Sequence, residues 1–558
     1  MSSRADSDAQ ERAASEATGT RRAGWTLRAR RFVAARWTDL VFAGLALALL
    51  VAVGRDAFGM RVVTQSQGAD YWEHSATFRA LLDDLWHPEN PHVASNESSP
   101  RFGPGFVLEA LVARRLGLDA LGAMGIASVV HTTLFLVGIY WFFREYFRDR
   151  RASLIALIVL FGSWHDAWHY SNVYQLKVFF SVASYPSTLA LGTTLIGFAW
   201  TLRVLRRREQ RPWDLLLLVA CWAFVFITHP LTAALSFSGF VLLTLFEPRI
   251  AWRRRLWVGS TLLGGCLLAS LWPYFQPWSV VSGGTRMEVE WVDQGLGAAI
   301  EDQASVELHQ FYELDGLVDT LWLSLAGVPV LVYLLIRRRY LFLVFGALAV
   351  GLPFAANAYV PLPLGHRFIL LTNFYLQAAL VYLLLTLTPG FEGAWRFVKR
   401  YRAGAFAGAA VVLAVLAYAA YDNVQSARAR LEAAARRARG GESPNVRYAR
   451  AVGELAGKHA VILADDRSSW PVPTFGPKVV GLLHANPLVA DWAQRSADVR
   501  RFLRTGRSAE RDRIIEKYRV THVLVKRQQD RSLRGFLSPR ATRRALPSGY
   551  VLYALKPR

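Results

Sequence analysis

Apolar residues gather along this chain into runs that are separated by short polar or basic segments. The longer runs approach the roughly 20 residues that a helix needs to cross a bilayer. They cover residues 40–53, 121–143, 152–163, 180–202, 215–228, 231–246, 256–272, 317–336, 341–360, 369–387 and 405–421. This pattern predicts a polytopic α-helical membrane protein with about 11 transmembrane helices. A weaker run at 106–116 carries Glu109 and predicts an interfacial or partly inserted helix.

Basic residues lie in alternate connections between these runs, and this alternation sets the predicted orientation. Arginines crowd residues 1–36, 144–151, 203–211, 249–255, 337–339 and 396–402. Because cytoplasmic loops are enriched in Lys and Arg, we expect these segments inside. The loops 54–119 and 275–316 are expected outside, and the second is strongly acidic. Residues 1–36 are predicted to be a disordered, basic cytoplasmic arm.

The formal net charge of +23 would also suit a protein that binds nucleic acid. Much of that charge falls in the predicted inside loops, where topology and anionic headgroups account for it. We therefore expect membrane lipids as partners of the basic segments, and no nucleic acid. Both cysteines, Cys221 and Cys266, lie within predicted spans. A structural disulfide or a cysteine-based metal site is not expected.

The composition changes after residue 421, where the predicted transmembrane region 37–421 ends. Residues 422–441 are rich in Ala and Arg and predict a linker helix. Residues 442–558 alternate buried-strand patterns, at 460–464 and 521–525, with helical patterns at 498–503 and 509–518. We expect a small α/β domain that topology places outside, where it would bind an acceptor, cover a cavity or stabilise the outer face.

Three polar clusters fall on the predicted outer side. The first loop carries Asp70, Glu73, His74 and Arg101, and the periodicity of residues 71–85 predicts a helix with Asp70 in or just before its first turn. Further members of the clusters are His165, Asp166, His169 and Lys177 after the third run, and His366 and Arg367 before the tenth. Ionisable residues at a membrane surface are functional candidates. An aromatic interface belt with solvated charges is the alternative for the first cluster.

The chain as a whole resembles the GT-C superfamily. The resemblance rests on an acidic residue after the first span, an amphipathic helix in a long first outer loop, a second acidic residue after the third span, a basic residue near a late span and a C-terminal outer α/β domain. The segment 91–104, the sequence Asp465-Asp466-Arg467 and the stretch 518–525 are similar to bacterial members of the superfamily. These membrane glycosyltransferases use polyprenyl-phosphate sugar donors, and they include protein O-mannosyltransferases and lipid A aminoarabinose transferases. The mannosyltransferases have adjacent Asp and Glu in the first loop, whereas Tyr71 and Trp72 separate Asp70 from Glu73 here.

The resemblance implies a GT-C-like fold and transfer of a hexosyl or pentosyl group to a glycan, lipid or protein acceptor, at the outer face of a bacterial inner membrane. Asp70 matches the catalytic carboxylate, and Asp166 is the second acidic candidate. A positioned carboxylate can take the proton of an acceptor hydroxyl. A lipid phosphate gains charge as it leaves, so cationic groups should face it. The candidates for that role are Arg367, Lys177 and His366, with Glu73, His74, His165, His169 and Arg101 as supporting residues.

His74, His165, His169 and Asp166 have side chains that suit a divalent metal ion. The chemistry requires no cofactor, because a phosphate-linked donor already has a good leaving group. A transporter or flippase is an alternative function, although its ionisable residues belong near the bilayer midplane, whereas these lie at span ends. A non-catalytic GT-C-like scaffold of envelope glycan assembly is the other alternative.

Overall fold

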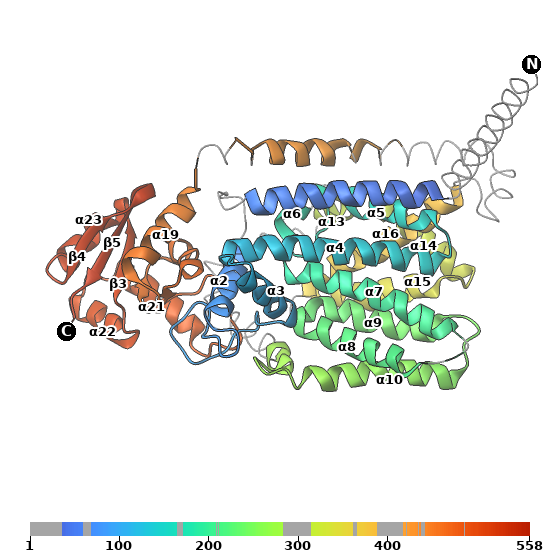
Figure 1. Cartoon of the computed structure of the whole chain (residues 1–558), viewed down its shortest axis with the longest axis horizontal. Helices are drawn as coiled ribbons and strands as arrows, with labels where there is room; N and C mark the ends of the chain where they lie inside the picture. The colour runs from blue at the N-terminus through green and yellow to red at the C-terminus, as the bar shows by residue number, and fades with distance from the viewer. Residues whose placement is uncertain are drawn as a thin grey trace, which may run out of the picture.

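The structure is a computed structural model, and it describes residues 36–59, 69–164, 171–207, 209, 211–282, 314–360, 365–387, 414, 417–419, 421–433, 435–436, 441–484 and 486–557. Long helices run side by side in a bundle, and the C-terminal α/β domain lies against one end of it (Figure 1). Two helices of the first long loop, α2 (Ala69–Asp83) and α3 (Pro104–Arg115), lie at that same end. We call it the α2 end of the bundle.

Among the described residues, four helices are long and apolar enough to cross a membrane. They are the first helix (Arg36–Gly59), α4 (Ala120–Phe147), α7 (Pro186–Arg206) and α16 (Phe368–Leu387). Shorter helices complete the bundle: α5 (Arg151–Gly162), α6 (Leu176–Val182), α8 (Pro212–Thr228), α9 (Pro230–Phe246), α10 (Trp252–Ala269), α13 (Leu314–Leu321), α14 (Gly327–Ile336) and α15 (Leu341–Asn357). The bundle is therefore that of a membrane protein.

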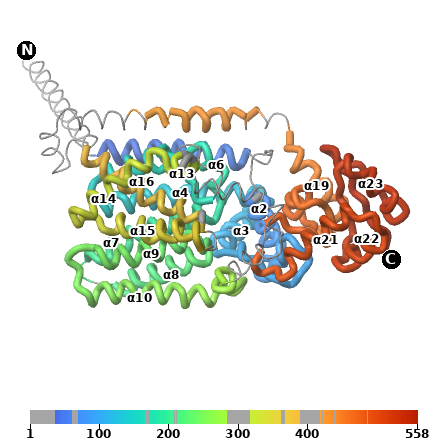
Figure 2. Tube along the Cα trace, turned by 180° about the vertical axis from the view of Figure 1, so that it is seen from behind, coloured from blue at the N-terminus to red at the C-terminus, as the bar shows by residue number. Residues whose placement is uncertain are grey.

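A helix occupies each predicted span up to residues 369–387, but two of these spans are interrupted. The run 180–202 is divided, because α6 ends at Val182 and α7 begins at Pro186. The run 317–336 contains the 3-10 segment η2 (Trp322–Ala326) between α13 and α14. Most of the predicted last span, 405–421, lies outside the described residues. The helix at 421–433 runs beside the first helix (Figures 1 and 2).

Glycines permit the close packing of α4 against α7. A Cβ atom at Gly138 would lie 2.6 Å from the Gly192 carbonyl oxygen, and one at Gly192 would lie 2.6 Å from the Phe135 backbone nitrogen. Small residues let two helix backbones approach each other in this way. The crossing joins the two long helices that lie behind α2 and α3.

Most of α2 is buried inside the protein. Every residue from 71 to 78 is buried. The helix packs against α3 and α4 of the membrane domain and against the 3-10 segment η4 (Val472–Phe475) of the C-terminal domain. Its polar side chains are thus held between two parts of the protein.

The C-terminal domain is a five-stranded sheet covered by helices on both faces. Its strands are β1 (Val461–Leu463), β2 (Lys478–Val479), β3 (His522–Lys526), β4 (Ala541–Ala545) and β5 (Tyr550–Leu555), in the spatial order β2-β1-β3-β5-β4. Its helices are α19 (Pro444–Ala456), α20 (Asp466–Ser469), α21 (Trp492–Arg504), α22 (Ser508–Lys517) and α23 (Arg527–Leu537). β1 pairs in parallel with both β2 and β3, while β5 is antiparallel to β3 and β4. The predicted α/β domain with strands at 460–464 and 521–525 is present.

The carboxyl ends of β1 and β2 point toward the membrane domain. The segment after β1 carries Trp470 and Thr474, and the segment after β2 carries His484. The Thr474 and Ser75 hydroxyl oxygens are 2.7 Å apart, and Trp470 stacks on His92 of the first long loop. In α/β sheets this edge, where neighbouring strands connect in opposite directions, is where ligands bind. In this protein, the segments that follow β1 and β2 pack against α2 and the first long loop.

Candidate functional site

The acidic cluster begins on one face of α2. Asp70 and Glu73 are three residues apart and therefore lie on the same side of the helix. Asp70 is in the first turn, as predicted, where the helix dipole favours a carboxylate. The Asp70 side chain is 37% exposed, whereas that of Glu73 is 8% exposed. The two carboxylates thus differ in their access to solvent.

Arg101 neutralises Glu73 from the loop before α3. Its Nε and Nη2 atoms donate to the two Glu73 carboxylate oxygens, at 2.9 and 3.1 Å. Such a two-point contact fixes both side chains. Burial alone would raise the pKa of Glu73, but the Arg101 charge and the hydrogen bond with His484 hold this pKa well below its usual range. The ionised form of Glu73 is therefore favoured, and both of its carboxylate oxygens have hydrogen-bond partners.

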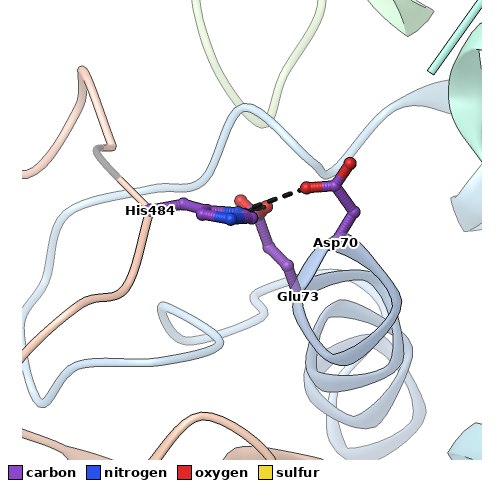
Figure 3. A group of neighbouring side chains, drawn as sticks. All are labelled: Asp70, Glu73 and His484. Carbon is purple, nitrogen blue, oxygen red and sulfur yellow. Dashed lines mark hydrogen bonds and ion pairs between the residues drawn. The ribbon is translucent and has the colours of Figure 1, made fainter. Parts of the chain in front are cut away.

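His484 completes the cluster from the C-terminal domain. Its Nδ1 atom lies 3.1 Å from Glu73 Oε2 and 3.3 Å from Asp70 Oδ1 (Figure 3). Burial would lower the pKa of this imidazole, but the hydrogen bond to Glu73 and the charges of both carboxylates raise it overall. A positively charged ring is thereby favoured between the two acids. The sequence did not predict this residue.

His74 is also on α2, and its ring packs against aromatic side chains. Its ring lies edge-on to Phe106, at 5.4 Å, and to Tyr185, at 5.0 Å. Burial, and then the Arg101 charge, lower the pKa of His74 to about 3, which favours the neutral ring.

The second and third predicted clusters are described only in part. His165, Asp166 and His169 lie outside the described residues. Lys177 lies in the first turn of α6, where its backbone N–H donates to Asn423 Oδ1. His366 is in the 3-10 segment η3 (Gly365–Arg367), and its side chain is outside the described part of the chain.

Arg367 ends η3, directly before α16. Its charge reaches His229, the residue that connects α8 and α9. Burial lowers the pKa of His229 to about 3, and the charges of Arg101 and Arg367 both contribute to that lowering. Arg101 and Arg367 therefore both favour the neutral form of the His229 imidazole.

A buried ion pair lies between the first helix and the helix at 421–433. An Arg430 guanidinium nitrogen is 3.5 Å from Asp56 Oδ2, and another is 2.6 Å from the Ser181 hydroxyl. The Asp56 side chain is 2% exposed. This ion pair therefore joins the helix at 421–433 to the first helix and, through Ser181, to α6.

Asp70, Glu73 and His484 each place one ligand atom within 4.8 Å of the others, an arrangement that could hold a metal ion. Carboxylate and imidazole ligands suit several divalent ions. This set differs from the predicted one, since His74 faces aromatic rings and the other three predicted ligands are outside the described residues.

His484 escaped prediction because β2 has only two residues and gives no periodic signal. The loop that follows it, around Leu483-His484, reads as an ordinary connection. Only its position after a strand could have indicated that His484 belongs to the site. A polar residue directly after a parallel strand lies at the edge of the sheet where ligands bind.

These features define a polytopic helical membrane protein with an acidic cluster at one end of its bundle, covered by an α/β domain. The sequence matches no family model and no curated protein. Solved structures share the fold. ArnT from Cupriavidus metallidurans in the apo state is 15% identical, with 94% of this chain and 100% of that chain covered and a TM-score of 0.51.

The same ArnT bound to undecaprenyl phosphate is also similar, with 15% identity, coverage of 94% and 100%, and a TM-score of 0.50. The apo oligosaccharyltransferase of Archaeoglobus fulgidus is 13% identical over 87% of this chain and 70% of that chain, with a TM-score of 0.48. ArnT and the oligosaccharyltransferase are members of the GT-C superfamily. The likeness to the two ArnT structures shows that this chain shares their overall fold.

Proposed function

We propose that this protein is a membrane glycosyltransferase that moves a sugar from a polyprenyl-phosphate-linked donor to an acceptor hydroxyl. The observation that carries the proposal is Asp70, a partly exposed carboxylate at the N-terminus of α2, inside a cluster of ionisable side chains at one end of a GT-C fold. We place the reaction at the outer face of a bacterial inner membrane, following the distribution of basic loops.

Asp70 is the proposed general base. As the acceptor oxygen attacks the anomeric carbon, its proton passes to the Asp70 carboxylate, and the bond between the anomeric carbon and the phosphate oxygen breaks. The polyprenyl phosphate leaves with the electron pair of that bond. Glu73 is unsuited to this role, because it is buried and already paired with Arg101 and His484.

The departing phosphate requires positive charge close to it. We assign this role to Arg367, with Lys177 and His366 assisting, because a guanidinium can contact two phosphate oxygens at once. Asp166 is the proposed second acidic residue.

The proposed reaction needs no cofactor, because the phosphate is a good leaving group. If a divalent ion binds, Asp70, Glu73 and His484 are the described residues that would hold it, and its charge would help to stabilise the phosphate. The acceptor is a glycan, a lipid or a protein, and the transferred group is a hexose or a pentose.

The decisive experiment compares Asp70→Asn with Asp83→Asn in purified protein. Asp83 lies on the same helix in an exposed pair with Arg79, so it is a matched control. Donor and acceptor are first identified by mass spectrometry of envelope glycans and lipids from cells with and without the protein. We expect Asp70→Asn to lower kcat about 100-fold or more, as for loss of a general base, and Asp83→Asn to change it less than about twofold. Sugar transfer by Asp70→Asn at the wild-type rate would refute the proposal.

A further inference from the structure

We propose that His484 is a positioning residue of this site, which holds the Asp70 carboxylate in place and makes docking of the C-terminal domain a condition for sugar transfer. This inference rests on the proposed function. It gives the C-terminal domain a defined part in the reaction.

The geometry of the imidazole carries the inference. One Nδ1 atom contacts two carboxylates on the same face of α2, at 3.1 Å to Glu73 and 3.3 Å to Asp70 (Figure 3). Glu73 already has Arg101 as a two-point partner, so it is a fixed anchor for the ring. Asp70 is 37% exposed and would otherwise sample several rotamers. Contact with His484 restricts it, while its exposure leaves room for an acceptor hydroxyl.

The first long loop holds the His484 segment on both sides. Before it, the Val479 N–H donates to the His92 carbonyl at 2.7 Å, and Lys478 Nζ donates to the Asn90 carbonyl at 2.5 Å. After it, the Ala490 N–H donates to Glu97 Oε1 at 3.0 Å. His484 therefore reaches Asp70 only when the domain is docked on residues 90–97.

Trp470 sets the lateral position of the ring. Its indole stacks on His92, with centroids 4.6 Å apart, and lies edge-on to His484 at 5.4 Å. Trp470 follows β1 and His484 follows β2, so two neighbouring strands of the sheet fix the imidazole. A site that must hold a reactive group needs this kind of rigid support.

The first test measures kcat and KM for His484→Ala and His484→Asn in the full-length protein. The Asn amide places a donor where His Nδ1 lies, so Asn should restore most of the rate. We expect His484→Ala to lower kcat about 10- to 100-fold with little change in KM, as for a misplaced catalytic group. Added imidazole should partly rescue it. His522→Ala, at the start of the central strand β3, is the matched control and should match wild type.

The second test separates positioning from docking. Cysteines at Ser75 and Thr474, whose oxygens are 2.7 Å apart, would form a disulfide that locks the domain onto α2, with Cys221 and Cys266 replaced by Ala. We expect the locked protein with His484→Ala to stay slow and the locked protein with His484 to be active. Full recovery of the locked His484→Ala variant would show a docking role alone and overturn the inference.

Further outcomes distinguish failure of the inference about His484 from failure of the proposed function. If Asp70→Asn is inactive and His484→Ala equals wild type, the inference fails while the proposed function stands. If neither variant changes the rate, the proposed function fails. If wild type is inactivated by EDTA, and excess Mn²⁺ restores His484→Ala, His484 is a metal ligand and the positioning role is wrong.

Discussion

Asp70 and Glu73 lie one turn apart on α2 but differ in exposure and partners. Glu73 is almost fully buried and shares its oxygens with Arg101 and His484. An acid so paired stays ionised and holds its neighbours in place. Asp70 has the more exposed carboxylate and a single contact with the same imidazole, so it is the one that a substrate can approach.

The position of Asp70 could be predicted at this scale, whereas that of His484 could not. Asp70 follows an apolar run and begins a helical pattern, and both signals are local. His484 is 411 residues from Glu73, its hydrogen-bond partner. No periodicity or spacing connects two residues so far apart, because only the docking of one domain on another brings them together.

Asp466, directly after β1, leads to a pH-dependent prediction. Burial raises its pKa from 3.8 to about 6, and its Oδ1 atom has no hydrogen-bond partner among the described residues. The folded domain therefore favours the protonated acid, so the stability gained is complete below pH 3.8 and is lost as pH rises through about 6. Asp466→Asn mimics the protonated form and should stabilise the protein near neutral pH by about 1–3 kcal/mol.

Thermal unfolding of wild type and Asp466→Asn at about pH 7.5 and about pH 4 measures this effect. We expect a higher melting temperature for the variant at the first pH and a much smaller difference at the second. An equal gain at both pH values would mean that the ionisation of Asp466 is not the cause.

At the scale of elements, α2 shows why a helix can be predicted while its surroundings are missed. Residues 71–85 have helical periodicity with a loose apolar face, and α2 covers Ala69–Asp83. A loose apolar face is typical of a surface helix. Polar side chains of α2 are buried as well, because Ser75 contacts Thr474 of the C-terminal domain and Glu73 is paired with Arg101.

The hydrophobic pattern also did not predict where the helices are interrupted. The run 180–202 contains no charged residue, yet α7 begins only at Pro186. Proline favours the first turn of a helix, where its missing N–H has no partner to lose. That residue was the local signal for the break between α6 and α7, and hydropathy alone does not detect it.

The contact between α4 and α7 predicts a cost for one added methyl group. Gly192→Ala would place a Cβ atom 2.6 Å from the Phe135 backbone nitrogen, so the two helices must separate. We expect a loss of about 1–3 kcal/mol in the free energy of unfolding. Gly259→Ala in α10, where nothing lies within 4 Å, is the control. It should gain about 0.5–1 kcal/mol from the better helix propensity of Ala. Unfolding in detergent with increasing SDS measures both, and equal effects would contradict the packing argument.

At the scale of the whole molecule, the α2 end of the bundle is assembled from parts that are distant in the sequence. The C-terminal domain brings His484, the loop before α3 brings Arg101, and α2 brings Asp70 and Glu73. The sequence predicted a helical membrane domain followed by a small α/β domain, because long apolar runs and a change in composition are properties of whole segments. It did not predict the contacts between segments, since these depend on side-chain packing across the domain interface.

The ion pair between Asp56 and Arg430 is predicted to stabilise the contact between the first helix and the helix at 421–433. Asp56 is 2% exposed and Arg430 is 20% exposed, at 3.5 Å from each other. Arg430→Gln would leave a buried carboxylate without its cation, which typically costs about 3–5 kcal/mol. Asp56→Asn removes the anion instead and should cost less, because Arg430 keeps its contacts with Ser181 and the Phe180 ring.

A double-mutant cycle tests this tie. If the two side chains stabilise each other directly, the double variant should lose less than the sum of the single variants, with a coupling of about 1–3 kcal/mol. Arg428→Gln, which breaks an exposed pair with Glu432 on the same helix, is the control and should cost less than about 1 kcal/mol. Strictly additive losses would mean that Asp56 and Arg430 act independently. The helix at 421–433 would then be held beside the first helix by its other contacts.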